Sequence, residues 1–262
     1  MSRSQLPLVA VDIGNSRIKL GLFESVERTG GRLPTPTQTL DVTPKTDSLD
    51  KIVGWLGAER LSLLPWWIGS VQRSVASKLV AWLRDRGVDR ITLMAAGDLP
   101  LVVSLPRPDM VGIDRLLGAL AANELRRSDT PAVIVDLGTA ITVDLVSAAG
   151  EFLGGAIMPG IGMSARALHE FTDLLPLLDM HALAEPPPAL GANTLEAMTS
   201  GIYWGAIGGV RHLIELLSGE CSQPPQVFLT GGAAPRVASL VSADASYEPH
   251  LVLAAIAIVG GR

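Results

Sequence analysis

The sequence has 262 residues, a formal net charge of −5 and 48% hydrophobic residues, with a mean hydropathy of +0.36. This negative net charge differs from the positive charge that is typical of nucleic-acid-binding proteins, so we expect no nucleic-acid partner. The apolar run Leu251–Val259 is far shorter than the ~18 residues of a membrane span and Cys221 is the single cysteine, which together favour a cytoplasmic protein without a membrane segment.

The high apolar content favours an α/β fold, because strands covered by helices on both faces are apolar at nearly every position. The chain is predicted to open with a strand hairpin. Leu8–Asp12 is an apolar run that ends in an acid, Gly14-Asn15-Ser16 predicts a turn, and Arg17–Phe23 alternates as a second strand. The segment Thr29–Ser48 is rich in Thr, Pro and Gly and predicts a loop or an edge strand.

The next segments predict a helix, short strands and a second helix. Apolar residues in Ser74–Arg86 have the spacing of an amphipathic helix. Arg90–Ala96 and Leu101–Ser104 predict strands, and Leu105–Val111, with two prolines, predicts a loop. A helix with one apolar stripe is expected to begin near Asp114.

The second half of the chain opens in the same way as the first. Ala132–Asp136 is an apolar run that ends in an acid, Gly138-Thr139-Ala140 predicts a turn, and Ile141–Val146 predicts a strand. Ser164–Phe171 is expected to be helical.

Three further segments follow in the second half. Glu185–Ala189 holds three prolines and predicts a loop. Asn193, with Glu196 three residues later, predicts a capped helix that runs to about Leu217. Val227–Leu229 predicts a strand that leads into Thr230-Gly231-Gly232.

The most informative feature is an internal repeat. Val11-Asp12-Ile13-Gly14-Asn15-Ser16 recurs as Val135-Asp136-Leu137-Gly138-Thr139-Ala140, about half the chain later. A duplicated fold with one hairpin in each lobe explains this recurrence. We predict lobes at residues 1–113 and 114–262 that face each other across a nucleotide cleft, and the last helix could pack back on the first lobe.

The twin hairpins suit nucleotide phosphates. A carboxylate at a strand end can hold a cation directly or through water, and a glycine turn lets backbone N–H groups approach phosphate oxygens. Magnesium usually binds one or two carboxylates together with phosphates. The Walker motif G-x-x-x-x-G-K-[ST] is absent, and the glycine-rich stretch Gly154–Gly162 lacks the dinucleotide-binding fingerprint.

A single Asp-x-Gly is weak evidence, because an acid beside a flexible glycine is common in β-turns. Two matched copies, with Thr230-Gly231-Gly232 after a third apolar strand, favour a phosphate site. The third motif is expected to approach the adenosine part of the nucleotide.

Gly112-Ile113-Asp114-Arg115 indicates an acceptor site at the start of a helix. Asp114 could accept the proton of an attacking hydroxyl, a role that in phosphoryl transfer mainly orients the nucleophile. Arg115 could bind a carboxylate or the transferring phosphoryl group. The alternative for Asp114 is a helix N-cap, and the two roles are compatible.

These motifs together resemble the ordered motifs of the type III pantothenate kinases, over residues 9 to 253. They are Asp12-Ile13-Gly14-Asn15-Ser16, Gly112-Ile113-Asp114-Arg115, Asp136-Leu137-Gly138-Thr139-Ala140, Gly155 with Pro159-Gly160, Gly191-Ala192-Asn193-Thr194 and Thr230-Gly231-Gly232. The resemblance implies duplicated ribonuclease-H-like lobes, as in actin, and phosphorylation of pantothenate by ATP, the first step of coenzyme A biosynthesis. It also implies a homodimer.

The resemblance further implies a role for individual residues. Asp114 would be the proton acceptor, with Gly112, Ile113, Arg115 and Thr194 at the pantothenate. Asp136 would bind a monovalent cation, K⁺ or NH₄⁺, and Asp12 would hold Mg²⁺ through phosphate or water. ATP would contact Asp12, Ile13, Gly14, Asn15, Ser16, Arg17, Ile18, Lys19, Thr139, Gly231 and Gly232.

The chain departs from the family pattern in the acceptor pocket. Leu105 stands where the family usually has a tyrosine, and Arg107 where an asparagine is frequent. Ser16 replaces the commoner threonine and keeps the hydroxyl. Two alternatives therefore stay open: a non-catalytic nucleotide-binding accessory protein of the same fold, and a kinase of another small alcohol.

Overall fold

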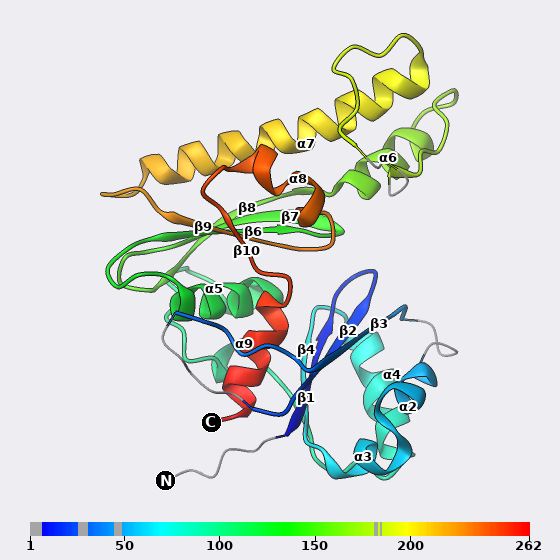
Figure 1. Ribbon diagram of the computed structural model, residues 1–262, viewed down its shortest axis with the longest axis vertical. Coiled ribbons are helices and arrows are strands. Elements are labelled where there is room, and N and C mark those ends of the chain that lie inside the picture. Colours follow the sequence, from blue (N-terminus) through cyan, green and yellow to red (C-terminus); the bar gives the residue numbers. More distant parts are fainter. Residues whose placement is uncertain (1–6, 26–30, 45–48, 181–182, 184) are drawn as a thin grey trace. The chain divides into compact units, whose positions relative to one another are not determined.

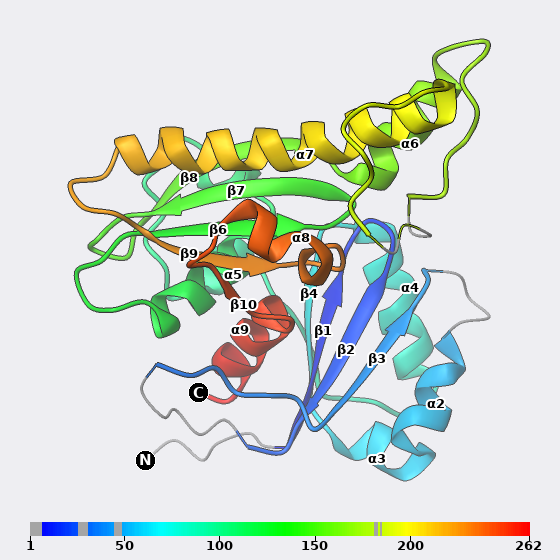
Figure 2. The ribbon, with the colours of Figure 1, turned by 45° about the horizontal axis from the view of Figure 1, so that its top comes forward.

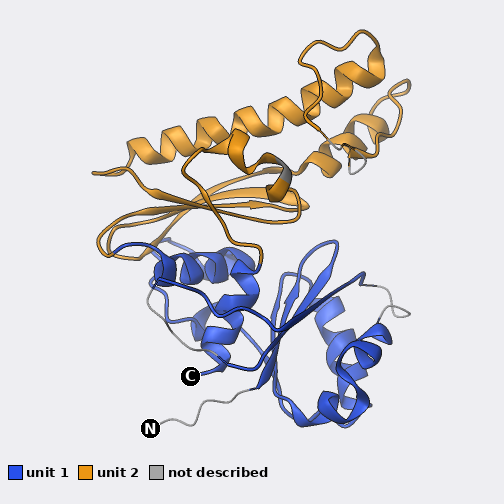
Figure 3. Ribbon diagram, viewed as in Figure 1, with its two compact units in different colours: residues 1–127, 250–262 blue, residues 128–249 orange. Residues whose placement is uncertain are grey.

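The computed structural model describes residues 7–25, 31–44, 49–180, 183 and 185–262 (Figure 1). The chain forms two compact units, coloured separately in Figure 3. Unit 1 comprises residues 1–127 and 250–262, and unit 2 comprises residues 128–249.

Unit 1 is built on a five-stranded mixed sheet with the order β3-β2-β1-β4-β5. The hairpin β1–β2 and the pair β2–β3 are antiparallel, whereas β4 and β5 run parallel to β1. The strands are β1 (Leu8–Ile13), β2 (Ile18–Phe23), β3 (Gln38–Val42), β4 (Trp66–Ser70) and β5 (Ile91–Leu93). Its helices are α2 (Lys51–Leu56), α3 (Ala58–Leu63), α4 (Arg73–Arg84), η1 (Ala96–Asp98), η2 (Pro108–Met110), α5 (Ile113–Leu125) and α9 (Leu251–Gly260).

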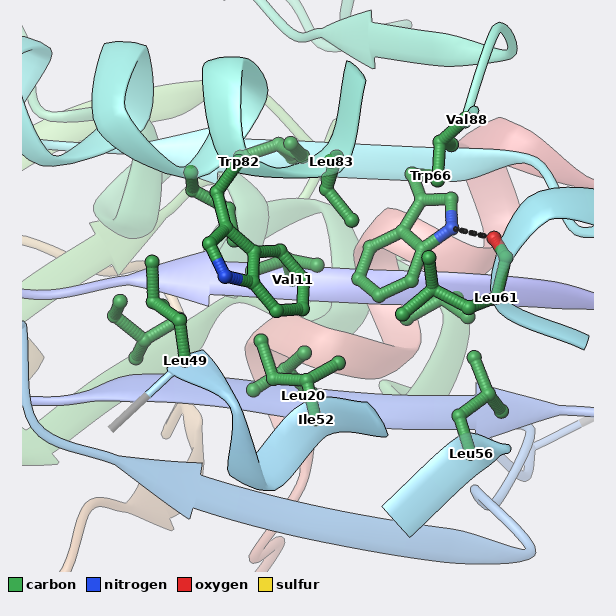
Figure 4. Packing of buried hydrophobic residues seen from close by; sticks show 14 of the residues in the cluster. Val11, Leu20, Leu49, Ile52, Leu56, Leu61, Trp66, Trp82, Leu83 and Val88 are labelled. Atoms are coloured by element: carbon green, nitrogen blue, oxygen red, sulfur yellow. Dashed lines mark hydrogen bonds between the residues drawn. The ribbon is translucent and has the colours of Figure 1, made fainter. Parts of the chain in front are cut away.

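Helices cover both faces of this sheet, and β1 is therefore buried at every position (Figure 1). One face of β1 carries Val11, which joins Trp66 and Trp82 in the hydrophobic core with side chains of α2, α3 and α4 (Figure 4). The buried indole of Trp66 donates to the carbonyl of Leu61 at 3.1 Å. Against the other face pack α5 and α9, since Leu117 and Ile256 lie beside Gly69 of β4.

Unit 2 repeats the plan with the sheet order β10-β9-β6-β7-β8. Its strands are β6 (Ala132–Leu137), β7 (Ala140–Val146), β8 (Phe152–Pro159), β9 (Gln226–Thr230) and β10 (Ser246–Tyr247), and its helices are α6 (Ile161–Glu170), α7 (Thr194–Gly219) and α8 (Ala234–Val241). In Figure 2 the long helix α7 runs along one face of this sheet, where Val210 packs with Val133 and Val135. Among the described residues, no helix combines the length and apolarity needed to cross a bilayer.

The two sheets have the same topology. In each, the first strand forms an antiparallel hairpin with the second, the third continues antiparallel, and the fourth and fifth run parallel to the first on its other side. The predicted α/β duplication with one hairpin in each half is confirmed at the level of strand order.

Several boundaries differ from the sequence-based expectation. The predicted strand Leu101–Ser104, flanked by Pro100 and Pro106, is wrong, because only an isolated bridge forms there. The expected boundary after residue 113 assigned α5 to the second half, whereas unit 1 contains α5 because its apolar face packs on α9 and β4. The last helix packs on β1, as considered from the sequence. The segment Thr29–Ser48 holds β3, with residues 29–30 and 45–48 outside the described part.

Candidate active site

The first hairpin presents an acid beside a tight, exposed turn. Asp12 is 9% exposed and pairs with Lys19 on β2 and with Gly69 on β4. The N–H of Gly14 donates to the carbonyl of Arg17 at 3.0 Å and closes the turn. Asn15, Ser16 and Arg17 are exposed, so this turn can offer backbone and side-chain donors to an anion.

The loop that follows β4 supports this turn. The N–H of Val71 donates to the carbonyl of Ile13 at 3.1 Å. The side-chain amide nitrogen of Gln72 donates to the carbonyls of Gly14 and Asn15, at 2.8 and 2.7 Å. The sequence reading did not single out Gln72. The internal repeat could have pointed to it, since β4 occupies in unit 1 the place that β9 occupies in unit 2.

The second hairpin has the same construction. Asp136 pairs with Thr142 on β7 and with Thr230 on β9. The N–H of Gly138 donates to the carbonyl of Ala140 at 3.1 Å, which closes the turn as Gly14 does in unit 1. Asp136 therefore holds in the second sheet the position that Asp12 holds in the first.

Glycines enclose the carboxylate of Asp136. A Cβ atom added at Gly231 would lie 2.4 Å from Oδ1 of Asp136, and one added at Gly138 would lie 3.3 Å from it. Gly231 also has φ +96°, a conformation that side-chain-bearing residues rarely adopt. The motif Thr230-Gly231-Gly232 thus begins at the last residue of β9, and its central glycine leaves space for the Asp136 carboxylate.

Gly160, from the predicted Pro159-Gly160 motif, contacts the backbone of the second turn. A Cβ atom at Gly160 would lie 2.4 Å from the carbonyl oxygens of both Gly138 and Thr139, and the N–H of Gly160 donates to the latter at 3.1 Å. Gly160 is the N-cap residue of α6, so the start of that helix packs on the backbone of the turn that carries Thr139.

The start of α5 holds the predicted proton acceptor. The N-cap position belongs to Gly112, so the N-cap alternative for Asp114 is wrong. Oδ1 of Asp114 instead accepts the N–H of Arg115 at 2.9 Å. A Cβ atom at Gly112 would lie 2.6 Å from this oxygen and 3.8 Å from a methyl of Val71, which places the motif beside the loop after β4.

Burial raises the pKa of the Asp114 carboxyl above its ordinary value, and the N–H and positive charge of Arg115 offset this only in part. A carboxylate with a raised pKa is a better proton acceptor, because its basicity lies closer to neutral pH. Perturbed groups of this kind are concentrated at functional sites.

Thr194 is the first residue of α7, next to the predicted cap. The Asn193 side chain accepts the N–H of Glu196 at 3.0 Å, and a Glu196 carboxylate oxygen accepts the N–H of Ala192 at 2.8 Å. A Cβ atom at Gly191 would lie 2.2 Å from the backbone nitrogen of Ala197, so the chain before Thr194 is folded tightly onto the helix start.

The predicted site residues thus form two groups. In unit 1 these are the first turn and the Gly112–Arg115 helix start, and Gln72, which was not predicted, supports the turn. Unit 2 brings together Asp136, the turn with Thr139, and the Thr230–Gly232 segment, and it also holds Thr194 at the start of α7.

Within the part of the chain that the structure describes, no three His, Cys, Asp or Glu side chains cluster as a metal cage. Single carboxylates beside glycine turns fit cations that take most of their ligands from phosphates, water or backbone carbonyls, as magnesium does in nucleotide sites. Asp12 and Asp136 are therefore compatible with such ions.

Comparison with known proteins identifies the family. The family model described as type III pantothenate kinase matches residues 8–216. The type III pantothenate kinase of Anaeromyxobacter dehalogenans is 34% identical over 261 residues, covering 97% of this chain and 99% of its own length. That of Gluconobacter oxydans is 31% identical over 264 residues, covering 97% and 93%.

Solved structures share the fold at low sequence identity. The ethanolamine utilization protein EutJ from Carboxydothermus hydrogenoformans aligns with a TM-score of 0.51 and 13% identity, covering 96% of this chain and 89% of its own. A putative N-acetylmannosamine kinase from Listeria monocytogenes aligns with a TM-score of 0.50 and 16% identity, covering 97% and 98%. These neighbours confirm the predicted actin-like ATPase fold, and the sequence matches show that this chain belongs to the type III pantothenate kinase family.

Proposed function

We propose that this chain transfers the γ-phosphoryl group of ATP to the 4′-hydroxyl of pantothenate and forms 4′-phosphopantothenate, the first step of coenzyme A biosynthesis. One observation carries the proposal: the type III pantothenate kinase model matches residues 8–216, a span that contains both acid-and-glycine hairpins and the Gly112–Arg115 helix start. We expect a cytoplasmic location, because the proposed reaction takes its phosphoryl group from ATP.

Both hairpins would contact the phosphates of one ATP. The segment Asp12–Lys19 and Thr139 would supply donors, and Gly231 and Gly232 would lie toward the adenosine. Asp12 would hold Mg²⁺ through phosphate or water, and Asp136 would hold K⁺ or NH₄⁺ beside its glycines. Bound magnesium would neutralise charge on the phosphate oxygens.

Asp114 would position the acceptor hydroxyl. Its Oδ1 accepts the Arg115 N–H, so we assign Oδ2 to the hydroxyl of pantothenate. As the hydroxyl oxygen bonds to the γ-phosphorus, the bond from that phosphorus to the β–γ bridging oxygen breaks, ADP leaves, and the hydroxyl proton passes to Asp114. Because the transition state of phosphoryl transfer is loose, orientation is the larger part of this role. Arg115, with Gly112, Ile113 and Thr194, would bind pantothenate.

A homodimer is the assembly that the family resemblance implies. Large apolar side chains on unit 2 support it: Phe171, Leu174 and Leu190 are 81%, 90% and 87% exposed. They lie just after α6 and just before α7, two helices that pack on each other (Figure 1). Exposed apolar side chains that gather in one region favour a protein interface. Sedimentation of the Leu174→Asp, Leu190→Asp double variant would test this, since a dimer interface there predicts monomers, and an unchanged dimer would contradict it.

The activity is tested with purified protein, ATP, Mg²⁺, K⁺ and pantothenate, by mass spectrometry of the product. The expected result is 4′-phosphopantothenate formed in proportion to ADP. Turnover of another small alcohol with pantothenate inert would reassign the acceptor. Binding of ATP without turnover of any alcohol would favour the accessory-protein alternative.

A further inference from the structure

We propose that Gln72 is a positioning residue for ATP, which acts by fixing the backbone of the first phosphate turn; this inference rests on the proposed function. Its side-chain nitrogen donates to two successive carbonyls, those of Gly14 and Asn15, at 2.8 and 2.7 Å.

The consequence for the turn follows from peptide geometry. In a trans peptide the C=O and N–H groups point in opposite directions. The carbonyls of Gly14 and Asn15 belong to the peptides that carry the N–H groups of Asn15 and Ser16. Because both carbonyls converge on one nitrogen of Gln72, both N–H groups are directed away from Gln72. Two adjacent donors fixed on one side of an exposed turn form an anion-binding surface.

The side chain of Gln72 has no local helical role that would explain this arrangement. Gln72 is the N-cap residue of α4, yet its side chain makes no capping hydrogen bond and instead reaches a turn 57 and 58 residues earlier. Its backbone is fixed in turn by Ser70, whose hydroxyl bonds to both the N–H and the carbonyl of Gln72 at 3.0 Å.

The internal duplication provides a comparison. The N–H of Val71 donates to the carbonyl of Ile13, and in unit 2 the N–H of Ala233 donates to the carbonyl of Leu137 at 3.2 Å. The residue after Val71 is Gln72, and the residue after Ala233 is Ala234, which has no side-chain donor. The two units therefore differ at this position, where an amide donor follows Val71 in unit 1 and an alanine follows Ala233 in unit 2.

The test compares Gln72→Met with the wild type. Methionine has a similar length and removes both hydrogen bonds. The first turn would lose its fixed donors, and we expect the KM and Kd for ATP to rise about tenfold, the effect of losing ~1.4 kcal/mol of binding. The KM for pantothenate should stay within about twofold, because the Gly112–Arg115 helix start keeps its own hydrogen bonds.

The matched control is Gln223→Met. Gln223 also donates its side-chain amide to a backbone carbonyl, that of Asp129, but in unit 2. Its loss should leave both KM values unchanged. A general loss of folding in Gln72→Met would lower the active fraction of the protein and hence the apparent kcat. The role of Gln72 instead predicts a rise in the KM for ATP alone, with the midpoint of thermal unfolding unchanged.

Equal ATP affinity in the Gln72→Met variant and the wild type would overturn the role of Gln72 and leave the proposed function intact. A parallel rise of both KM values would also overturn it. Failure of the wild type to bind ATP would instead refute the proposed function.

Discussion

Gly231 approaches Asp136 so closely that a single added carbon would lie 2.4 Å from the carboxylate oxygen Oδ1. This contact links the end of β9 to the end of β6, neighbouring parallel strands of the same sheet. Because Gly231 has no side chain, it leaves space for the Asp136 carboxylate. We therefore expect a substitution at Gly231 to displace that carboxylate.

Gly231→Ala should lower stability and ATP affinity together. A non-glycine residue at φ +96° costs about 1–3 kcal/mol of backbone strain, and its Cβ would displace the Asp136 carboxylate. Urea unfolding and ATP titration would measure the two effects. Gly87→Ala is the control, since Gly87 also has a positive φ, +78°, no atom lies within 4 Å of a Cβ placed there, and no site residue is assigned beside it. Equal behaviour of the two variants would show that the close contact has no consequence.

Asp114→Asn should remove activity without destabilising the protein. Loss of a proton acceptor typically lowers kcat about 10²–10⁴-fold. Burial raises the pKa of Asp114, so the folded state favours the neutral carboxyl. The neutral carboxyl therefore stabilises the folded state below the ordinary pKa of aspartate, and this stabilisation is lost as the pH rises through the raised pKa. At neutral pH the asparagine variant should therefore unfold at an equal or higher temperature than the wild type.

The stability difference between Asp114→Asn and the wild type should shrink as the pH is lowered, because the wild-type carboxyl then becomes neutral too. Differential scanning calorimetry at several pH values would measure it. An asparagine variant that is clearly less stable at neutral pH would contradict the burial of an ionised carboxylate at this position.

The wild-type rate should also fall on the acid side as Asp114 becomes protonated. The raised pKa of Asp114 predicts that this fall begins at a higher pH than an ordinary aspartate would give. A profile of kcat against pH, with the same profile for ATP binding as the control, would locate it. A rate that stays constant to the ordinary pKa of aspartate would exclude Asp114 as the acceptor.

Asp136→Asn should abolish the response to potassium. Removing the negative charge while keeping the shape weakens a cation site that relies on a single carboxylate. Initial rates in potassium chloride and in choline chloride at equal ionic strength would be compared for both proteins. The wild type should be several-fold faster in potassium and the variant equally slow in both. A variant that keeps the potassium response would place the cation elsewhere.

We expect Leu105→Tyr to lower the KM for pantothenate, because the family resemblance implies a tyrosine at this position beside the substrate. Arg107 is held by two hydrogen bonds to Asp109, at 2.9 and 2.7 Å, so its replacement by asparagine would release Asp109 as well. Val102→Tyr, an exposed position outside the motif, is the control. An unchanged KM for pantothenate in Leu105→Tyr would show that this departure does not limit acceptor binding.

The hairpins, α4, α5 and α7 could be predicted from the sequence because their signals are local. Alternation, an acid at a strand end and a glycine turn are all contained within about a dozen residues. The same holds for Asn193, whose capping hydrogen bond to Glu196 spans three residues. The repeat then made the shared topology of the two halves a natural expectation.

The features that were missed depend on contacts distant in sequence. Gln72 lies 57 and 58 residues from the two carbonyls that it supports. The strand β8 was not predicted because its glycines obscure the strand pattern, although Gly155 is required there, since a Cβ would lie 2.1 Å from the carbonyl of Val143. The place of α5 in unit 1 follows from packing against α9, near the other end of the chain. None of these partners can be read from local spacing.

The central claim is that the acids Asp12 and Asp136 serve one nucleotide. The most direct measurement is a crystal structure with a non-hydrolysable ATP analogue and Mg²⁺. The claim predicts one nucleotide per chain, with its phosphates in contact with both the turn at residues 14–16 and the turn at residues 138–139. Phosphates that contact only one of these turns, or neither, would contradict it.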